Sequence, residues 1–306
     1  MELDAAQQEG GSAGSEDRRL ITLTTTDSGS ARTSMSSDHL PSDPCIAFTG
    51  VRMAFGSRMV FEALSCAFPR GRISVILGGS GSGKSTILRL IGGLVHPQRG
   101  SITVDGTEIT RLSERGLYRV RAKLGMMFQG GALLDSMTVF DNLAFPLREH
   151  SRLREAEIAA QVHERLGTVG LSNVDALLPG QLSGGMMKRV ALARATMMKP
   201  IMLLCDEPFS GLDPVSASRI EALLLALNRE LGMTIIAVSH DVSSTMRMAD
   251  WLLVLLPGKA VQGTPKEIAG SNDPQVAHFL NPMLELESPP LGAGSPPLEK
   301  AAKGIS

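Results

Sequence analysis

One stretch of the chain, residues 78–86, has the residue types and the spacing of a loop that binds phosphate groups. Its sequence GGSGSGKST fits the pattern G-x-x-x-x-G-K-[ST]. Glycines allow successive backbone N–H groups to point inward at phosphate oxygens. Lys84 would neutralise phosphate charge, and the Ser85 hydroxyl would help to hold Mg²⁺. The candidate nucleotide-binding residues of this stretch, called the glycine loop below, are Gly78, Gly79, Ser80, Gly81, Ser82, Gly83, Lys84, Ser85 and Thr86.

The segments on either side of the glycine loop agree with this interpretation. Residues 72–77 form a short β-branched run that predicts a buried strand, and residues 87–91 continue as a helix until Gly92 and Gly93. The N-terminus of that helix adds unpaired N–H donors and partial positive charge. A Gly/Ser linker that matches the pattern by accident would need neither the strand nor the helix, so the stretch predicts a nucleotide site.

Three further apolar runs predict strands that end in polar residues. They are residues 124–129 ending in Gln129, residues 201–207 ending in Asp206 and Glu207, and residues 234–241 with His240 near the end. Strands that alternate with helices predict a mostly parallel sheet covered on both faces. Because ligands bind beyond the carboxyl ends of such strands, we expect these polar groups to meet the glycine loop at one sheet edge.

The remaining segments predict one folded domain between two tails. Residues 1–44 are polar and offer little surface to bury, which predicts a disordered tail. Structure is expected to begin near Ile46, and a helical subdomain is expected over about 138–198, where apolar residues take helical spacing. The domain is expected to end near residue 286, and the Pro-Pro pairs beyond it predict a flexible tail over 287–306.

Composition excludes several classes of protein. The 306-residue chain has a formal net charge of −1, which gives no electrostatic attraction to nucleic acid. Its three cysteines, an odd number spaced far apart, indicate a reducing compartment without a disulfide framework. The N-terminus lacks the apolar region of a secretory signal, and the longest apolar run, residues 251–256, is too short to span a bilayer.

Several motifs occur together in a fixed order: the glycine loop, Gln129, LSGGM at 182–186, the Asp206–Glu207 pair, SGLD at 210–213, and His240. Over about residues 45–270 this set resembles the nucleotide-binding subunits of ATP-binding cassette (ABC) transporters. The resemblance implies an α/β fold of the P-loop NTPase type, with a mostly parallel sheet core, an antiparallel β subdomain and an inserted helical subdomain. It also implies an ATPase that binds ATP and Mg²⁺ and is coupled to transmembrane transport.

The resemblance assigns roles to residues outside the glycine loop. Phe55 matches the aromatic residue that stacks on adenine, with a core phenylalanine as the alternative. Gln129 matches the residue that reaches Mg²⁺ and the attacking water, so the metal ligands would be Ser85, Gln129 and, through water, Asp206. Glu207 would be the general base that orients water in line with the γ-phosphate. His240 would hold Glu207 and the γ-phosphate in register.

The segment Ser183, Gly184 and Gly185 is a second helix N-terminus suited to an anion. In the family it binds the ATP of the opposite subunit, which implies a homodimer with two ATP molecules at the interface. Asp213 matches a residue that communicates between the two sites. The usual motif ends in Gln where this chain has Met186, and because that contact lies outside the phosphate shell we expect ATPase chemistry to survive.

A narrower resemblance lies in residues 130–150, which in the family border the groove for the permease. This segment resembles the ATPase subunits of Mla (MCE-type) phospholipid transporters of Gram-negative envelopes, and Met186, residues 119–121 and residues 209–211 agree with that subgroup. The resemblance implies peripheral attachment to the cytoplasmic face of the inner membrane. The implied partners are an integral-membrane permease, a periplasmic MCE-domain protein and a small cytoplasmic STAS-domain protein, with phospholipid as substrate.

Three other functions are weighed against this one. A soluble cassette ATPase of translation or DNA repair would carry a second cassette or a long coiled coil, and the sequence shows no sustained heptads. A module that binds ATP without hydrolysis would lack the base Glu207. The main alternative is the ATPase of a transporter for another substrate, such as an amino acid, a metal or a lipoprotein.

Overall fold

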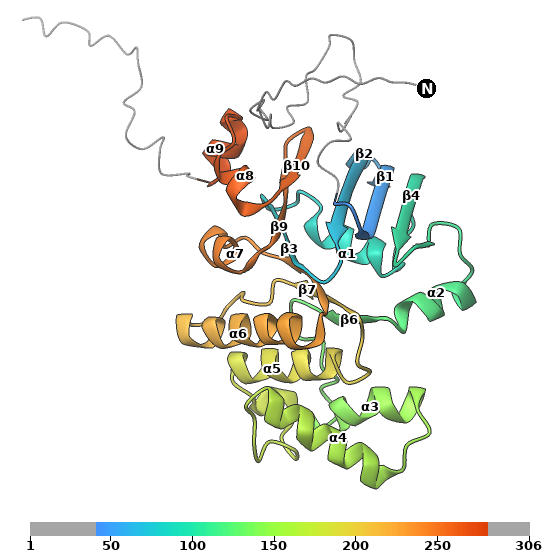
Figure 1. The fold of residues 1–306 in the computed structure, drawn as a ribbon. Coiled ribbons are helices and arrows are strands. Elements are labelled where there is room, and N and C mark those ends of the chain that lie inside the picture. The colour runs from blue at the N-terminus through green and yellow to red at the C-terminus, as the bar shows by residue number, and fades with distance from the viewer. Residues whose placement is uncertain (1–40, 281–306) are drawn as a thin grey trace, which may run out of the picture.

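The computed structural model describes residues 41–280, and the tails expected over 1–44 and 287–306 lie outside these residues except for 41–44. Two sheets and the helices beside them form the upper part of the molecule in Figure 1, and a group of helices forms the lower part. Within the described residues, none of the helices combines the length and the apolar character needed to cross a bilayer.

The central sheet has six strands in the order β10-β9-β3-β8-β7-β6. Its strands are β3 (Ile73–Gly78), β6 (Leu124–Met127), β7 (Met202–Asp206), β8 (Thr234–Val238), β9 (Trp251–Leu256) and β10 (Lys259–Gly263). All neighbouring pairs are parallel except β9 and β10, which form an antiparallel edge. Every residue of β3, β7 and β8 is buried, as expected for strands covered on both faces.

A second sheet of four strands is antiparallel, in the order β2-β1-β4-β5. Its strands are β1 (Pro44–Phe55), β2 (Arg58–Pro69), β4 (Arg99–Val104) and β5 (Thr107–Glu108). Together the two sheets and the helices confirm the predicted α/β architecture, with a mostly parallel core and an antiparallel part.

The described residues also form nine α-helices and a short 3₁₀ helix, of which the last two α-helices follow the final strand. They are α1 (Lys84–Ile91), α2 (Glu114–Arg121), α3 (Val139–His150), α4 (Glu155–Thr168), a 3₁₀ turn (Pro179–Gln181), α5 (Gly184–Ala195), α6 (Pro214–Leu231), α7 (Val242–Met248), α8 (Pro265–Ala269) and α9 (Pro274–Leu280). Helices α5 and α6 lie side by side beneath the central sheet, and α3 and α4 lie below them (Figure 1).

Alternating side chains of the central sheet pack into two different cores. Leu204 and Ile236 pack on one face with α1 and the antiparallel sheet. Leu203 and Ile235 pack on the other face with α6. A third core lies among α3, α4 and α5, and it includes Leu143. The helical segment therefore has its own apolar interior, while α5 also contributes Ala191 and Leu192 to the core under the sheet.

The parallel register brings the carboxyl ends of β6, β7 and β8 to nearly one level. Asp206, the last residue of β7, pairs with Val238, the last residue of β8, and Met127 of β6 pairs with Cys205. Strand β6 ends two residues before Gln129, earlier than the sequence predicts. Beyond the strand, the Gln129 carbonyl accepts a hydrogen bond from Lys188 of α5.

Candidate nucleotide-binding and catalytic site

A cavity of about 820 Å³ opens at the carboxyl ends of β3, β7 and β8. Its volume lies in the range of small-molecule sites, roughly 300–1,000 Å³. Residues of seven separate segments line it: Phe55, Arg58, Val60, the glycine loop except Ser82, Gln129, Glu207, His240 and Phe279. The structure therefore brings Glu207, His240 and Gln129 to the glycine loop, as the sheet topology predicts.

The glycine loop leaves backbone donors free at the start of α1. Gly83 precedes the helix with φ of +99°, and its position at the helix N-terminus offers no side chain to cap the first turn. The unpaired N–H groups and the helix dipole are therefore available to an anion. The Lys84 ammonium is buried and donates to the carbonyl oxygens of Gly78 and Gly79 at 2.8 and 3.0 Å. Burial lowers the pKa of Lys84.

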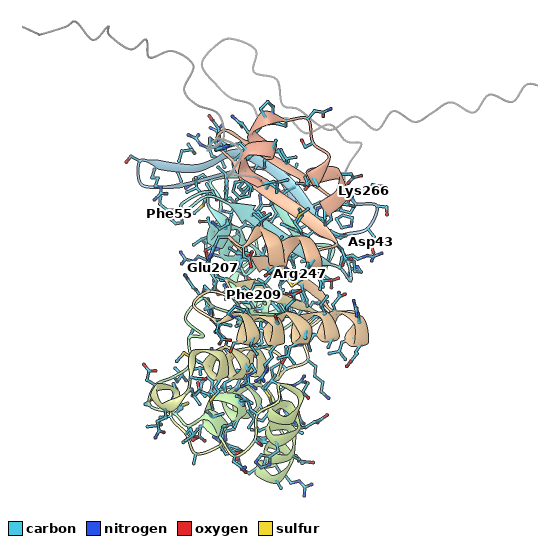
Figure 2. The ribbon with its side chains drawn as sticks, turned by 90° about the vertical axis from the view of Figure 1, so that its left-hand side faces the viewer. Asp43, Phe55, Glu207, Phe209, Arg247 and Lys266 are labelled. Atoms are coloured by element: carbon cyan, nitrogen blue, oxygen red, sulfur yellow. The ribbon has the colours of Figure 1, made fainter. Side chains whose placement is uncertain are left out.

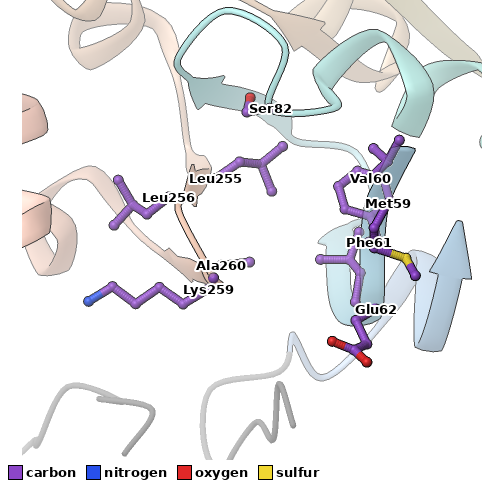
Figure 3. Close-up of a pocket in the computed structure, with 11 residues that line it drawn as sticks. Met59, Val60, Phe61, Glu62, Ser82, Leu255, Leu256, Lys259 and Ala260 are labelled. Atoms are coloured by element: carbon purple, nitrogen blue, oxygen red, sulfur yellow. The ribbon is translucent and has the colours of Figure 1, made fainter. Parts of the chain in front are cut away.

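Strands β2 and β9 pack closely against the glycine loop. A Cβ atom built on Gly83 would lie 2.5 Å from the ring of Phe61, and one built on Gly78 would lie 2.8 Å from the carbonyl oxygen of Leu255. Phe61 and Leu255 also flank a separate cavity of about 220 Å³ beside Ser82 (Figure 3). At these two positions a larger residue would need both an unfavourable backbone conformation and displaced neighbours.

Oxygen atoms suited to Mg²⁺ lie next to the glycine loop. The Ser85 hydroxyl donates to Asp206 Oδ1 at 2.9 Å, across 121 residues of sequence. Asp206 is only 9% exposed, and its burial raises its pKa. A buried carboxylate beside a hydroxyl suits a hard cation that prefers oxygen ligands. Gln129, the third predicted ligand, is exposed and lines the same cavity. The donor set therefore fits Mg²⁺.

The side chains of Glu207 and His240 are paired. His240 Nδ1 lies 3.1 Å from Glu207 Oε2, and both residues line the cavity. Glu207 follows β7 with φ of +50°, a left-handed conformation that is uncommon for residues other than glycine. In Figure 2 Glu207 lies between the sheets above and the helices below. The carboxylate thus stands at the open end of the sheet with an imidazole beside it.

Phe55 lies at the end of β1, is 45% exposed, and lines the cavity, so its ring is available for stacking. Three other lining residues, Arg58, Val60 and Phe279, were not predicted from the sequence. Arg58 donates to the carbonyl oxygen of Gly81 at 3.1 Å, and Phe279 reaches the cavity from α9, near the end of the described residues. Arg58 comes three residues after Phe55, which is the signal that could have identified it, whereas no sequence pattern marks Phe279.

The residues predicted to bind the partner's ATP do not line the cavity that contains Lys84. Ser183 is exposed and caps α5 by accepting from the Met186 N–H at 3.3 Å. Asp213 caps α6 by accepting from the Val215 and Ser216 N–H groups at 3.0 Å, and the hydrogen bonds from Ser216 lower its pKa. Both segments therefore begin helices at the surface, at a distance from this chain's own glycine loop.

Known proteins share this sequence and architecture. The family model described as ABC transporter matches residues 61–210. Over 226 residues the chain is 44% identical to a Haemophilus influenzae protein named intermembrane phospholipid transport system ATP-binding protein MlaF, with 74% of this chain and 86% of that protein covered. The chain belongs to the ABC transporter family of ATP-binding proteins. It is an ATPase subunit coupled to transport.

Two further family members extend the comparison. A Mycobacterium tuberculosis protein named probable ribonucleotide transport ATP-binding protein mkl is 41% identical over 247 residues, which cover 80% of this chain and 69% of that protein. A solved dimer of an ATP-binding cassette in a post-hydrolysis state, bound to ADP and Pi, superposes with a TM-score of 0.67 at 29% identity. That structure covers 72% of this chain and 98% of its own. The ABC cassette fold is thereby confirmed.

Proposed function

We propose that this chain is the ATP-hydrolysing subunit of an inner-membrane transporter that moves phospholipids between the inner and outer membranes and so maintains the lipid asymmetry of the outer membrane. The observation that carries the choice of substrate is the 44% identity to MlaF over 74% of the chain. Residues 130–150, which the family resemblance places beside the permease groove, agree with this choice. The chain would bind peripherally to the cytoplasmic face of the inner membrane.

The geometry supports a mechanism for ATP hydrolysis. The glycine loop and the N-terminus of α1 bind the phosphates, and Phe55 stacks on adenine. Ser85, Asp206 and Gln129 would hold Mg²⁺, which supplies charge neutralisation at the phosphate oxygens. Glu207 accepts a proton from water aligned with the γ-phosphate. His240, 3.1 Å from the Glu207 carboxylate, orients that carboxylate and can contact the γ-phosphate.

A homodimer would complete the site. Ser183, Gly184 and Gly185 lie outside the cavity of their own chain, so they are free to bind the ATP of a partner copy, with Asp213 between the two sites. Two copies would support an integral-membrane permease resembling MlaE. A periplasmic MCE protein resembling MlaD and a cytoplasmic STAS protein resembling MlaB would complete the transporter.

The substrate is tested by purifying the tagged chain from its native membrane in mild detergent and identifying bound proteins and lipids by mass spectrometry. Co-purification of a multipass permease, an MCE-domain protein, a STAS-domain protein and phospholipid is the expected result. A permease with a soluble solute-binding protein would instead indicate another cargo. The mkl relative, whose name specifies ribonucleotide transport, makes nucleotide cargo the alternative to examine.

The role of Glu207 is tested by the substitution Glu207→Gln in the same purified complex. Loss of a general base typically lowers the rate by about 10²–10⁴-fold, while the phosphate contacts of the glycine loop are unchanged. We therefore expect kcat to fall by at least about 100-fold and the affinity for ATP to be retained. Glu114→Gln, which changes an exposed carboxylate at the start of α2, is the matched control and should behave as wild type. Normal hydrolysis by Glu207→Gln would refute the assignment.

A further inference from the structure

Lys188 is a buried cation that the proposed mechanism does not use. It lies in α5, the helix that begins with the Ser183–Gly185 segment, and it is 7% exposed. An ammonium group has three donors and no acceptor. Burial of such a charge is unfavourable unless its donors are satisfied, so the positions of its partners show what Lys188 holds in place.

The Lys188 ammonium donates to three oxygen atoms that lie on two segments, one after β6 and one after β7. Nζ lies 2.5 Å from the carbonyl oxygen of Gln129, 3.0 Å from the carbonyl oxygen of Glu207 and 3.4 Å from Ser210 Oγ. Two of these partners are backbone atoms of residues in the proposed site. The third is a hydroxyl in the loop between β7 and α6. One side chain therefore joins the segments that follow β6 and β7 to α5.

The contact with Glu207 is made where the backbone needs support. Glu207 has φ of +50°, a conformation that a glutamate adopts only when its surroundings hold it there. Its N–H donates to the Val238 carbonyl at 3.1 Å. Its own carbonyl oxygen accepts from Lys188 and, at 3.0 Å, from the Ser210 hydroxyl. These bonds fix the peptide on both sides of the Cα atom from which the catalytic carboxylate projects.

We propose that Lys188 is a positioning residue for hydrolysis, which sets the backbone of Glu207 and Gln129 from α5 and so places the general base in register with the γ-phosphate. The proposal rests on the proposed role of Glu207. It also predicts that the position of the base depends on α5, because the helix that presents Ser183–Gly185 to a partner's nucleotide holds the base of its own chain.

The test compares Lys188→Met, which keeps most of the length and loses all three donors, with Lys188→Arg, which keeps charge and donors. Both are assayed in the complex purified from its native membrane. A misplaced catalytic group costs up to about 10²-fold in rate. We expect Lys188→Met to lower kcat by about 10–100-fold while KM and the equilibrium affinity for ATP change less than twofold. Lys188→Arg, which keeps the charge and the donors, should retain a higher kcat than Lys188→Met.

A matched control separates catalysis from stability. Lys259 of β10 is a partly buried lysine, paired with Asp273, and it takes no part in the cavity that contains Lys84. Lys259→Met should reduce thermal stability and leave kcat per folded molecule unchanged. If Lys188→Met does not fold, Ser210→Ala removes another donor to the Glu207 carbonyl and should lower kcat about threefold at constant KM.

The possible results distinguish this proposal from the proposed function. If Glu207→Gln is inactive, a wild-type kcat in Lys188→Met overturns the positioning role. Where Lys188→Met does not fold, a wild-type kcat in Ser210→Ala overturns it instead. The positioning role is also overturned if Lys188→Met loses no more kcat per folded molecule than Lys259→Met does. Normal hydrolysis by Glu207→Gln would instead refute the general-base assignment on which the proposal rests.

Discussion

Asn142 gives a prediction whose magnitude follows from its contacts. The side chain is fully buried at the start of α3. Its Oδ1 accepts from the Leu134 N–H at 2.8 Å, and its Nδ2 donates to the carbonyl oxygens of Leu134, Met137 and Thr138 at 3.0–3.1 Å. These bonds fold the segment that follows Gln129 onto the helix, and this is the segment expected to border the permease.

Asn142→Ala would remove all of these bonds. The Leu134 and Thr138 carbonyls keep other partners, from the N–H groups of Met137 and Asn142. The main loss is therefore at the Leu134 N–H and the Met137 carbonyl, with a weaker loss at Arg194, which donates to Asn142 Oδ1 at 3.4 Å. Each unsatisfied buried group costs about 1–3 kcal/mol. Because this segment is partly exposed, we expect the substitution to lower the free energy of unfolding by about 2–3 kcal/mol in total. For a domain of this size that lowers Tm by roughly 2–4 °C per kcal/mol, or about 4–12 °C.

The assay is denaturant and thermal unfolding, followed by ATP binding and hydrolysis in the purified complex. Asn228→Ala is the control, because Asn228 is a partly buried amide with two bonds, to the carbonyls of Gly71 and Met233, and should cost about 1 kcal/mol. Because Asn142 does not line the cavity that contains Lys84, ATP affinity should be unchanged. An unfolding free energy within about 0.5 kcal/mol of wild type would refute this account of the segment.

Two other predictions concern the phosphate site and acid stability. Lys84→Ala should lose nucleotide affinity in equilibrium binding while far-ultraviolet circular dichroism stays native; normal affinity would contradict the proposed phosphate contact. Hydrogen bonds from Lys123 and then Arg70 lower the pKa of Asp105 below 3.8. The stability they contribute is therefore complete above the unfolded-state pKa, about 3.9, and is lost as pH falls through the lower folded-state pKa. Between pH 5 and pH 2 the wild type should lose more unfolding free energy than Asp105→Asn, and equal losses would exclude the pairing as the cause.

Local sequence predicted much of the central sheet for a simple physical reason. A strand covered on both faces must be apolar throughout, so residues 72–77, 201–205 and 234–238 stand out without any knowledge of their neighbours. Strand β9 was not predicted, because residues 251–256 were considered only as a membrane span. Their strand conformation depends on pairing with β3 and β10.

The order of motifs along the chain determined the family and the types of residue available for chemistry. The glycine loop, the Asp206–Glu207 pair and His240 could be named from residue type and spacing alone, since each follows a short apolar run. Their assignment as site residues remains a prediction that the mutations above will test. The sequence by itself also determined that the three cysteines are far apart along the chain. In the structure all three are free and buried.

Only the tertiary structure decided which of these groups touch. Ser85 and Asp206 are 121 residues apart and form a hydrogen bond because β8 brings β3 and β7 together. The left-handed backbone of Glu207 and the place of Lys188 beneath it leave no pattern in the sequence. The reason is that local patterns encode secondary structure through near neighbours, whereas strand order and burial arise from contacts that close long loops of chain.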